Sequence, residues 1–339
     1  MNLLQETLAA IRPQDQNIRR QAKERLDQLT MPPWALGRLL DLALDLAGMT
    51  GSLQPEVERR LIITMAGDHG VAEEGVSAFP PEVTGQMVAN IANGGAGINA
   101  LARVARARVQ VVDMGAACDL SALVDSGRIL SKRIAPGTAN IARGVAMSRE
   151  QAVRTLEAGI EIARSFAATT DLFGTGEMGI ANTTPSSAIV AVLTGTSVEQ
   201  ATGCGTGIDP ERRRHKVAVI ERALRINRPD PGDGLDGGGG ADEAVDDDRF
   251  AQGGGAALIA QALAPTATDY MIAAHHSMEP GHRQALIRLG KKPLLDLDFR
   301  LGEGTGAALA MNLAEGAQRI LTEMATFAEA AVSQGQDSA

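Results

Sequence analysis

The sequence predicts an α/β protein with a Rossmann-like, mostly parallel sheet, helices on both faces of the sheet, and a small helical domain made from the N- and C-terminal segments. Two observations predict this fold. From Leu61 onward, short apolar runs are each followed by a Gly-rich loop and then by a helical pattern, which is typical of βα units around a parallel sheet. Before Leu61, residues 2–11, 14–29 and 35–48 have the spacing of Leu, Ile and Ala that is typical of helices.

Five of the apolar runs are expected to be strands of the sheet. They occupy residues 61–66, 109–114, 171–173, 269–274 and 293–298. The loops after them read G-D-H-G, G, G-T-G-E-M-G, H-H-S and F-R-L-G-E-G, so they concentrate Gly, His and Glu. Because ligands of open α/β sheets bind at the carboxyl ends of the strands, we expect a site among these loops.

The chain is expected to divide into two domains. Residues 1–50 together with 313–339 would form the small helical domain, and residues 51–312 the large α/β catalytic domain. One segment departs from the βα pattern, because residues 232–255 are rich in Gly and Asp and have almost no apolar side chains. Such a segment cannot bury enough surface to offset the entropy of ordering it, so we expect a mobile loop.

Composition excludes several classes of function. The 339 residues carry a net charge of −9 and only 2% aromatic residues, which argues against nucleic acid and against anionic membranes as partners. The two cysteines, Cys118 and Cys204, form neither a disulfide framework nor a metal motif, and we expect reduced packing thiols. The N-terminus lacks the basic start and apolar stretch of a signal peptide, and no segment has membrane-spanning length. A cytoplasmic protein is expected.

One carboxylate stands out in the predicted loops. Glu303 lies between glycines in R-L-G-E-G-T-G (residues 300–306), after a predicted strand and before a helix expected over residues 307–320. A carboxylate in such a loop, with little countercharge nearby, would be a proton acceptor with a raised pKa. The alternative is an ordinary capping or solvated glutamate.

A Gly-rich segment in the middle of the chain has features of an anion site. It reads G-T-G-E-M-G-I-A-N-T-T-P (residues 174–185) and leads into a helix with Thr184 as the expected N-cap and Gly195 as the stop. Glycines let the backbone approach a ligand, and the start of a helix presents free N–H groups to an anion. It is not a Walker A loop, because no G-K-[ST] follows.

A second Gly-rich segment follows shortly after. It reads T-G-C-G-T-G-I-D (residues 202–209) and precedes a helix that carries Arg212, Arg213, Arg214 and Lys216. Two glycine loops and a nearby cation suit a sugar phosphate. The alternative is a tight turn followed by solvated arginines.

The histidines are candidates for a metal site, with Asp68 assisting. His69, His275, His276 and His282 have neither the i, i+4 spacing nor the H-E-x-x-H form of a zinc site. We therefore expect these histidines to have hydrogen-bonded structural roles, and we predict no metal ligands.

Six motifs in this order are typical of one family. They are G-D-H-G-V-A-E-E-G-V-S-A-F-P-P-E-V-T-G-Q-M (67–87), G-G-A-G-I-N-A-L-A (94–102), G-E-M-G-I-A-N-T-T (176–184), T-G-C-G-T-G-I-D (202–209), H-S-M-E-P-G-H (276–282) and L-D-L-D-F-R-L-G-E-G-T-G-A-A-L-A (295–310). Together they closely resemble the nicotinate-nucleotide–dimethylbenzimidazole phosphoribosyltransferase family, which prepares the lower-ligand nucleotide of cobalamin. The resemblance extends over roughly residues 30–325.

The resemblance implies a reaction that needs neither cofactor nor metal. Nicotinate mononucleotide would donate its 5-phosphoribosyl group to 5,6-dimethylbenzimidazole, giving α-ribazole 5′-phosphate and nicotinate with inversion at the anomeric carbon. The cationic nicotinate leaving group supplies the driving force. The attacking benzimidazole nitrogen must lose its proton, and carboxylates serve glycosyl chemistry of this kind. The family also implies a homodimer.

The resemblance implies a role for each matching residue. Glu303 would be the general base and Glu177 a second acidic residue near the bases. Ser77 and Gln86 match the region that lines the aromatic-base pocket. The ribose-phosphate side is matched by Gly176, Gly179, Asn182, Thr183, Gly205, Thr206, Gly207 and Lys216.

The chain departs from the family pattern in two places. Residues 31–39 read M-P-P-W-A-L-G-R-L where the family usually has K-P-P-G-S-L-G-R-L, so a charge and a hydroxyl are lost and Trp34 is gained. Residues 232–249 replace most of a helix–strand unit, through loss of the element or through a shifted reading frame. A missing central strand is expected to leave a gap or an unpaired edge in the sheet.

These departures leave alternatives open. One is a related phosphoribosyltransferase with another acceptor, such as adenine, another benzimidazole or a phenol, which Trp34 motivates. Another is a catalytically crippled nucleotide-binding homologue, which residues 232–249 motivate, although intact Glu303 and both glycine loops speak against it. A metal hydrolase built on the histidines is the least favoured.

Overall fold

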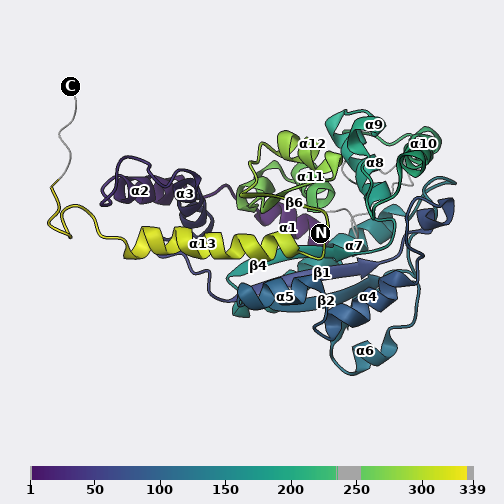
Figure 1. Ribbon diagram of the computed structural model, residues 1–339, viewed down its shortest axis with the longest axis horizontal. Helices are drawn as coiled ribbons and strands as arrows, with labels where there is room; N and C mark the ends of the chain where they lie inside the picture. The colour runs from purple at the N-terminus through teal and green to yellow at the C-terminus, as the bar shows by residue number, and fades with distance from the viewer. Residues whose placement is uncertain (1, 234, 236–252, 334–339) are drawn as a thin grey trace.

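Four parallel strands form the main sheet of the computed structural model, which describes residues 2–233, 235 and 253–333 (Figure 1). The strands are β1 (Arg60–Gly67), β2 (Arg108–Gly115), β3 (Ile129–Ser131) and β4 (Leu172–Met178). Their order is β3-β2-β1-β4, with β1 paired to both β2 and β4. The predicted α/β class with a mostly parallel sheet is therefore confirmed.

The two faces of the sheet are covered by different helices. Ile62 and Ala66 of β1 pack against α4 (Val83–Ala92), α5 (Gly97–Val104) and the first half of α13 (Thr305–Glu323). The alternate residues Leu61 and Ile63 pack on the other face against α7 (Arg149–Phe166). Because both faces are buried, the strand is a continuous apolar run rather than an alternating one.

A second, two-stranded parallel sheet corrects the prediction of a single sheet. It pairs β5 (His275–Ser277) with β6 (Leu295–Phe299). Among the described residues, β4 therefore has a strand neighbour on one side only. This interruption agrees with the gap or unpaired edge expected from a missing central strand.

Two strand predictions were wrong in their limits. Residues 269–274 are not a strand, because Pro265–Tyr270 forms the short helix η3 and the strand begins only at His275. Gly174 to Met178, expected as a loop, belong to β4 and pair with β1. Glycine at position 174 lets α13 lie close to β4, since a Cβ there would be 2.9 Å from Cε of Met311 and 3.1 Å from Cβ of Ala307.

The predicted mobile loop, residues 232–255, falls mostly outside the described residues. Its last part was assigned wrongly, because α11 (Gly253–Leu263) begins inside it. Helix α11 packs with α8 (Thr183–Thr194), α9 (Val198–Ala201) and α12 (Pro280–Leu289) around Val190, Leu258 and Ala285.

The three predicted N-terminal helices are present as α1 (Leu3–Ala10), α2 (Gln16–Leu26) and α3 (Arg38–Thr50). Helices α2 and α3 pack against the second half of α13 around Leu40 and Leu321. Helix α1 instead contacts α7, where the N–H of Leu4 donates to Oε1 of Glu157 at 3.1 Å. The division into two domains stays a prediction.

A buried arginine attaches α13 to the start of β1. Arg60 is 3% exposed, donates to the carbonyl oxygens of Val57 and Ala105 at 2.9 Å each, and forms an ion pair with Glu315 of α13. Hydrogen bonds from Arg60 and Arg106 lower the pKa of Glu315 to about 2. The ionised pair fixes α13 along the sheet.

The remaining elements connect these layers. They are η1 (Gly70–Glu74), α6 (Ser121–Asp125), η2 (Ala167–Thr169) and α10 (Pro210–Asn227). Among the described residues, no helix is long and apolar enough to cross a membrane. Cys118 and Cys204 are free, as predicted, but both lie in loops and are exposed rather than packed.

Leu321→Ala should lower the free energy of unfolding by about 2–5 kcal/mol, because it leaves a cavity between α3 and α13. Leu321 is 0% exposed. Urea denaturation measures the change, and Ile287→Ala at a 66% exposed position of α12 is the control. Equal stability of the two variants would contradict the helical packing described above.

Candidate active site

Glu303 lies in the short loop between β6 and α13, and its backbone is fixed by three neighbours. Its φ is 60°, a left-handed conformation that is unfavourable for a non-glycine residue. Its N–H donates to the carbonyl oxygen of Glu177 at 3.2 Å, and its carbonyl oxygen accepts the hydroxyl of Thr64 at 3.1 Å. A Cβ on Gly176 would overlap that same carbonyl oxygen, so the loop can sit on β4 only because residue 176 is glycine.

The Glu303 carboxylate is directed at the start of α5. Its Oε2 accepts the N–H of Ile98 at 3.1 Å, in the first turn of that helix, and the residue is 2% exposed. Burial raises the pKa of Glu303, and the Ile98 N–H partly opposes this effect. A buried carboxylate with a raised pKa and one hydrogen bond is suited to accept a proton.

Glu177 is the second-last residue of β4 and lies beside Glu303, whose N–H donates to its carbonyl oxygen. Its Oε2 accepts a hydrogen bond from the side-chain amide of Asn182. Burial and then the charge of Glu303 raise the pKa of Glu177 to about 8, while Asn182 lowers it. Two neighbouring carboxyl groups with raised pKa values do not both ionise readily, and near neutral pH Glu177 keeps its proton.

Lys216 of α10 is the buried cation of the site. It is 1% exposed, and its Nζ donates to the hydroxyl of Thr183. In the described part of the chain it forms no ion pair within 4.0 Å. Burial lowers the pKa of Lys216 to about 8, although the carboxylate of Glu279 raises it. A buried ammonium group with a hydroxyl partner is suited to bind an anion.

The glycine loops meet at this cation. A Cβ on Gly205 would lie 3.4 Å from Nζ of Lys216 and 2.8 Å from the Thr183 hydroxyl, so the loop backbone comes close to both groups. Helix α8 begins at Thr183 with Asn182 before it, so the capping position is Asn182 and not Thr184 as predicted. The predicted stop at Gly195 is confirmed by its left-handed φ of 68°.

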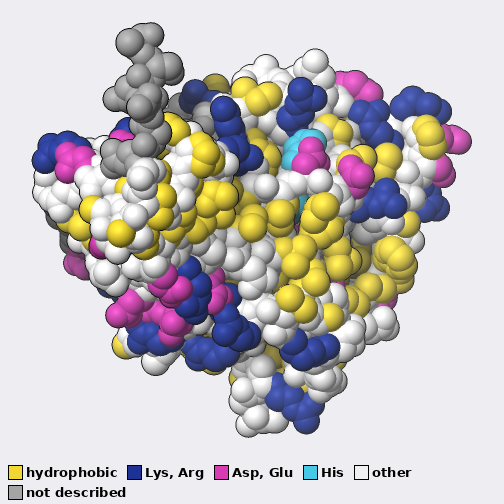
Figure 2. All heavy atoms as spheres, turned by 60° about the vertical axis from the view of Figure 1, so that its left-hand side comes forward, with side chains coloured by type: hydrophobic (Ala, Val, Ile, Leu, Met, Phe, Trp, Pro, Cys, Tyr) yellow, Lys and Arg dark blue, Asp and Glu magenta, His cyan; other side chains and the backbone are white. Residues whose placement is uncertain are grey.

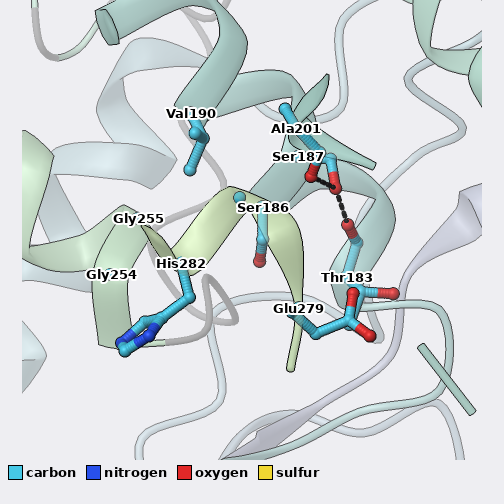
Figure 3. Close-up of a pocket in the computed structure, with 10 residues that line it drawn as sticks. Thr183, Ser186, Ser187, Val190, Ala201, Gly254, Gly255, Glu279 and His282 are labelled. Carbon is cyan, nitrogen blue, oxygen red and sulfur yellow. Dashed lines mark hydrogen bonds between the residues drawn. The ribbon is translucent and has the colours of Figure 1, made fainter. Parts of the chain in front are cut away.

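Glu279 is a site residue that the sequence did not assign. It is 7% exposed, and its Oε1 accepts the N–H of Gly205 at 2.8 Å. Thr183 and Glu279 lie at one end of a small pocket and His282 at the other (Figure 3). The H-S-M-E-P-G-H motif contains Glu279, but the spacing of its residues does not predict that Glu279 contacts the glycine loop.

The residues predicted for the acceptor base are brought only partly together. Ser77 lies beside Thr206, with 3.2 Å between the two hydroxyl oxygens. Gln86 lies in the first turn of α4 and makes no hydrogen bond with the other predicted residues among those described.

Two glycines predicted for the ribose-phosphate side lie in different surroundings. Gly179 packs on the carbonyl of Gly67, so a Cβ on Gly179 would overlap that carbonyl oxygen. Gly207 is an exposed turn residue with φ of 94°.

The histidines form local contacts. The rings of His275 and His282 stack with centroids 5.6 Å apart, and Nδ1 of His282 accepts the N–H of Ser277 at 3.1 Å. Burial lowers the pKa of His282 to about 4, so it is neutral near pH 7. Within the described ranges, no group of three or more His, Cys, Asp or Glu side chains is placed to hold a metal ion.

Comparison with known proteins agrees with this geometry. A phosphoribosyltransferase family model matches residues 11–245 and 251–332. The nicotinate-nucleotide–dimethylbenzimidazole phosphoribosyltransferase of Syntrophotalea carbinolica is 73% identical over 354 residues, covering 99% of this chain and 100% of that protein. The protein of the same name from Desulfotalea psychrophila is 52% identical, covering 98% and 99%. The crystal structure of CobT from Thermus thermophilus matches with a TM-score of 0.86 at 43% identity, covering 94% of this chain and 100% of that chain.

The chain belongs to the nicotinate-nucleotide–dimethylbenzimidazole phosphoribosyltransferase family. The match to the family model is interrupted at residues 246–250, inside the Gly/Asp-rich stretch. The alignment with the Syntrophotalea carbinolica protein spans 354 positions against 339 residues here, so that relative has residues with no counterpart in this chain. The comparisons therefore agree with the departure noted in the sequence.

Glu177→Gln should change how stability depends on pH. The pKa of Glu177 is raised in the folded chain to about 8 from an ordinary value of 4.5. Its contribution to stability is therefore complete below about pH 4.5 and is lost as pH rises through about 8. Between about pH 5 and pH 8, wild type should lose on the order of 1–3 kcal/mol more stability than the variant.

Urea unfolding at several pH values measures this difference. Glu221→Gln, at an exposed position of α10, is the control and should follow wild type. Identical pH profiles for wild type and Glu177→Gln would mean that Glu177 does not hold its proton in the folded chain.

Proposed function

We propose that this chain transfers the 5-phosphoribosyl group of nicotinate mononucleotide to 5,6-dimethylbenzimidazole, with Glu303 as the general base. The observation that carries the proposal is the buried Glu303 carboxylate, held against Ile98 with a raised pKa beside Glu177. The names and high identity of its relatives support the same substrates. The products are α-ribazole 5′-phosphate and nicotinate.

The reaction exchanges one C–N bond for another. A nitrogen of the acceptor attacks C1′ of the ribose, and the bond from C1′ to the pyridinium nitrogen breaks with its electron pair going to nicotinate. Attack by one ring nitrogen gives the benzimidazole a positive charge. The ring becomes neutral when the proton on its other nitrogen passes to the Glu303 carboxylate. The acceptor enters on the face opposite to the departing base, which inverts the anomeric carbon.

Glu177 and the buried polar groups around it would orient the substrates. Protonated Glu177 leaves Glu303 as the single anion beside the oxocarbenium-like carbon, which favours positive charge there without repelling the acceptor. Lys216 and Thr183 would hold the 5′-phosphate beside Gly205, whose lack of a side chain leaves room next to both groups. Gly176, Gly179, Asn182 and Gly207 would complete the ribose-phosphate side, and Ser77 and Gln86 would line the acceptor pocket.

The alternative acceptors have less support. Trp34, which motivates them, donates from Nε1 to Asp41 at 3.3 Å and lies under Nζ of Lys23, so its contacts are with α2 and α3. A panel of adenine, substituted benzimidazoles and phenols tests this alternative. Faster turnover with any of them than with 5,6-dimethylbenzimidazole would replace the proposed acceptor.

We also propose a cytoplasmic homodimer. Apolar side chains gather across one face of the molecule (Figure 2), and large apolar side chains that are more than half exposed include Phe79, Met278, Leu297 and Leu301. Such surface is more typical of an interface than of a monomer. Light scattering behind a sizing column measures the mass.

Glu303→Gln should reduce kcat by about 10²–10⁴-fold while the protein stays folded, because the amide cannot accept the acceptor's proton. The measurement is α-ribazole 5′-phosphate formation under saturating substrates, with thermal unfolding as a check on the fold. Glu221→Gln is the matched control. Turnover within about threefold of wild type would refute Glu303 as the base.

Lys216→Met should raise the KM for nicotinate mononucleotide about tenfold or more, equivalent to about 1.4 kcal/mol of binding energy. In wild type the affinity for the mononucleotide should fall as pH rises above about 8, where Lys216 loses its proton. Initial rates at varied pH measure both effects. Lys132→Met, which removes a surface pair with Glu161, is the control. An unchanged KM in Lys216→Met would exclude the lysine from the phosphate site.

A further inference from the structure

One hydroxyl joins the two regions that the sequence assigns to different substrates. Thr206, predicted for the ribose-phosphate side, lies 3.2 Å from the hydroxyl of Ser77, predicted for the acceptor pocket. The same Thr206 hydroxyl accepts the N–H of Ala78 at 3.0 Å. We call residues 75–79 the acceptor segment and residues 202–207 the phosphate loop. Thr206 connects the tip of the acceptor segment, Ser77 and Ala78, to the phosphate loop.

Neighbouring residues of the phosphate loop face opposite partners. Gly205 lies beside the buried cation, since a Cβ there would be 3.4 Å from Nζ of Lys216, and its N–H donates to Glu279. The next residue, Thr206, reaches the acceptor segment. Gly205 and Gly207 have φ of 50° and 94°, so Thr206 is held in a tight turn between two left-handed positions. Because Gly205 and Thr206 are consecutive in this turn, a shift of the loop beside Lys216 moves the Thr206 hydroxyl as well.

The start of the acceptor segment is held by contacts that do not involve Thr206. Glu74, immediately before it, receives hydrogen bonds from two residues of α10: Nε2 of His215 lies 2.6 Å from its carbonyl oxygen, and Arg222 pairs with its carboxylate. The side chain of Asn140 also donates to Glu74 at 2.7 Å. Gly75 follows with a φ of 72°, which gives the chain a turn between Glu74 and the tip.

Two sets of contacts hold the tip: the side chain of Val76, which is 2% exposed, packs in the core beside Ile180, and the Thr206 hydroxyl contacts Ser77 and Ala78. The tip is exposed at Ala78 and Phe79, and the Phe79 N–H donates back to the Ser77 hydroxyl at 3.3 Å. Losing the Thr206 hydroxyl would leave Ser77 and Ala78 without their contacts to the phosphate loop but would not disturb the anchor at Glu74. A mutation can therefore remove the contacts at the tip of the segment and leave those at its start intact.

We propose that Thr206 is a positioning residue that couples the two substrates of the proposed reaction. An anion held by Lys216 beside Gly205 orders the phosphate loop, and the Thr206 hydroxyl transmits this order to Ser77 and Ala78. The acceptor then binds more tightly once the phosphate is in place, and by thermodynamic linkage the phosphate binds more tightly once the acceptor is in place. This inference rests on the proposed function, and it gives Thr206 the role of a link rather than of a phosphate ligand.

The coupling is measured with inorganic phosphate and 5,6-dimethylbenzimidazole as probes. Calorimetry gives the Kd of the acceptor with and without saturating phosphate, and the ratio of the two is the coupling factor. Wild type and Thr206→Ser should give a factor of about five or more, in the usual range for coupled sites. Thr206→Val keeps the branched shape but lacks the hydroxyl, and should give a factor near one with an unchanged Kd for phosphate.

Two further variants make the test specific. Ser77→Ala, Thr206→Val and the double variant form a double-mutant cycle. The coupling factor of the double variant should equal that of Thr206→Val alone. Thr50→Val removes an equivalent local hydroxyl, which donates to Leu46 at 2.8 Å in α3, and should keep the wild-type coupling. In turnover, Thr206→Val should raise the KM for the acceptor about fivefold and keep kcat within about twofold.

Several outcomes would overturn the inference. Coupling that persists in Thr206→Val, or is absent in wild type, would exclude Thr206 as the link. Loss of phosphate affinity in Thr206→Val would make Thr206 a phosphate ligand instead. Failure of wild type to form α-ribazole 5′-phosphate, with the coupling present and dependent on Thr206, would reject the proposed reaction and support the link.

Discussion

The contact between Gly176 of β4 and the backbone of Glu303 is the constraint on which the candidate site depends. No side chain fits between them, so the loop after β6 lies directly on the main sheet. The contact brings Glu303 within reach of Thr64, Glu177 and the start of α5. It holds a glutamate in a left-handed conformation, and strain of this kind persists only where the surroundings fix it. The proposed base is therefore positioned by tertiary packing and not by its own loop.

Helix α13 transmits this constraint through the rest of the molecule. Its first turn follows Glu303, its first half covers the sheet beside Ile62, and its second half packs on α2 and α3. The buried pair of Arg60 and Glu315 fixes the helix in its middle. Because α13 contacts both sheets and the helical layer, the interruption of strand pairing beside β4 leaves the Glu303 loop in place.

The site buries acidic groups at one end and a basic group at the other, and burial shifts the pKa values of both. Glu303 and Glu177 share one end, where burial raises both pKa values. Lys216 occupies the other, where burial lowers its pKa. Asn182 and Thr183, consecutive at the start of α8, connect the two, since one donates to Glu177 and the other accepts from Lys216. A substrate with a cationic centre and an anionic phosphate matches this separation of charge.

The sequence by itself determined the parallel α/β class, the terminal helices and the family, because apolar periodicity and Gly-rich loops are local patterns. The local pattern around Glu303 predicted it as a proton acceptor, and the family resemblance added Lys216. Only the tertiary structure decided the split into two sheets, since strand pairing is not local, and moved a strand from 269–274 to His275–Ser277. Only packing brought Glu279 to Gly205 and Thr206 to Ser77, because these pairs are 74 and 129 residues apart in the chain. Contacts over such distances depend on how the elements pack, and no local pattern records them.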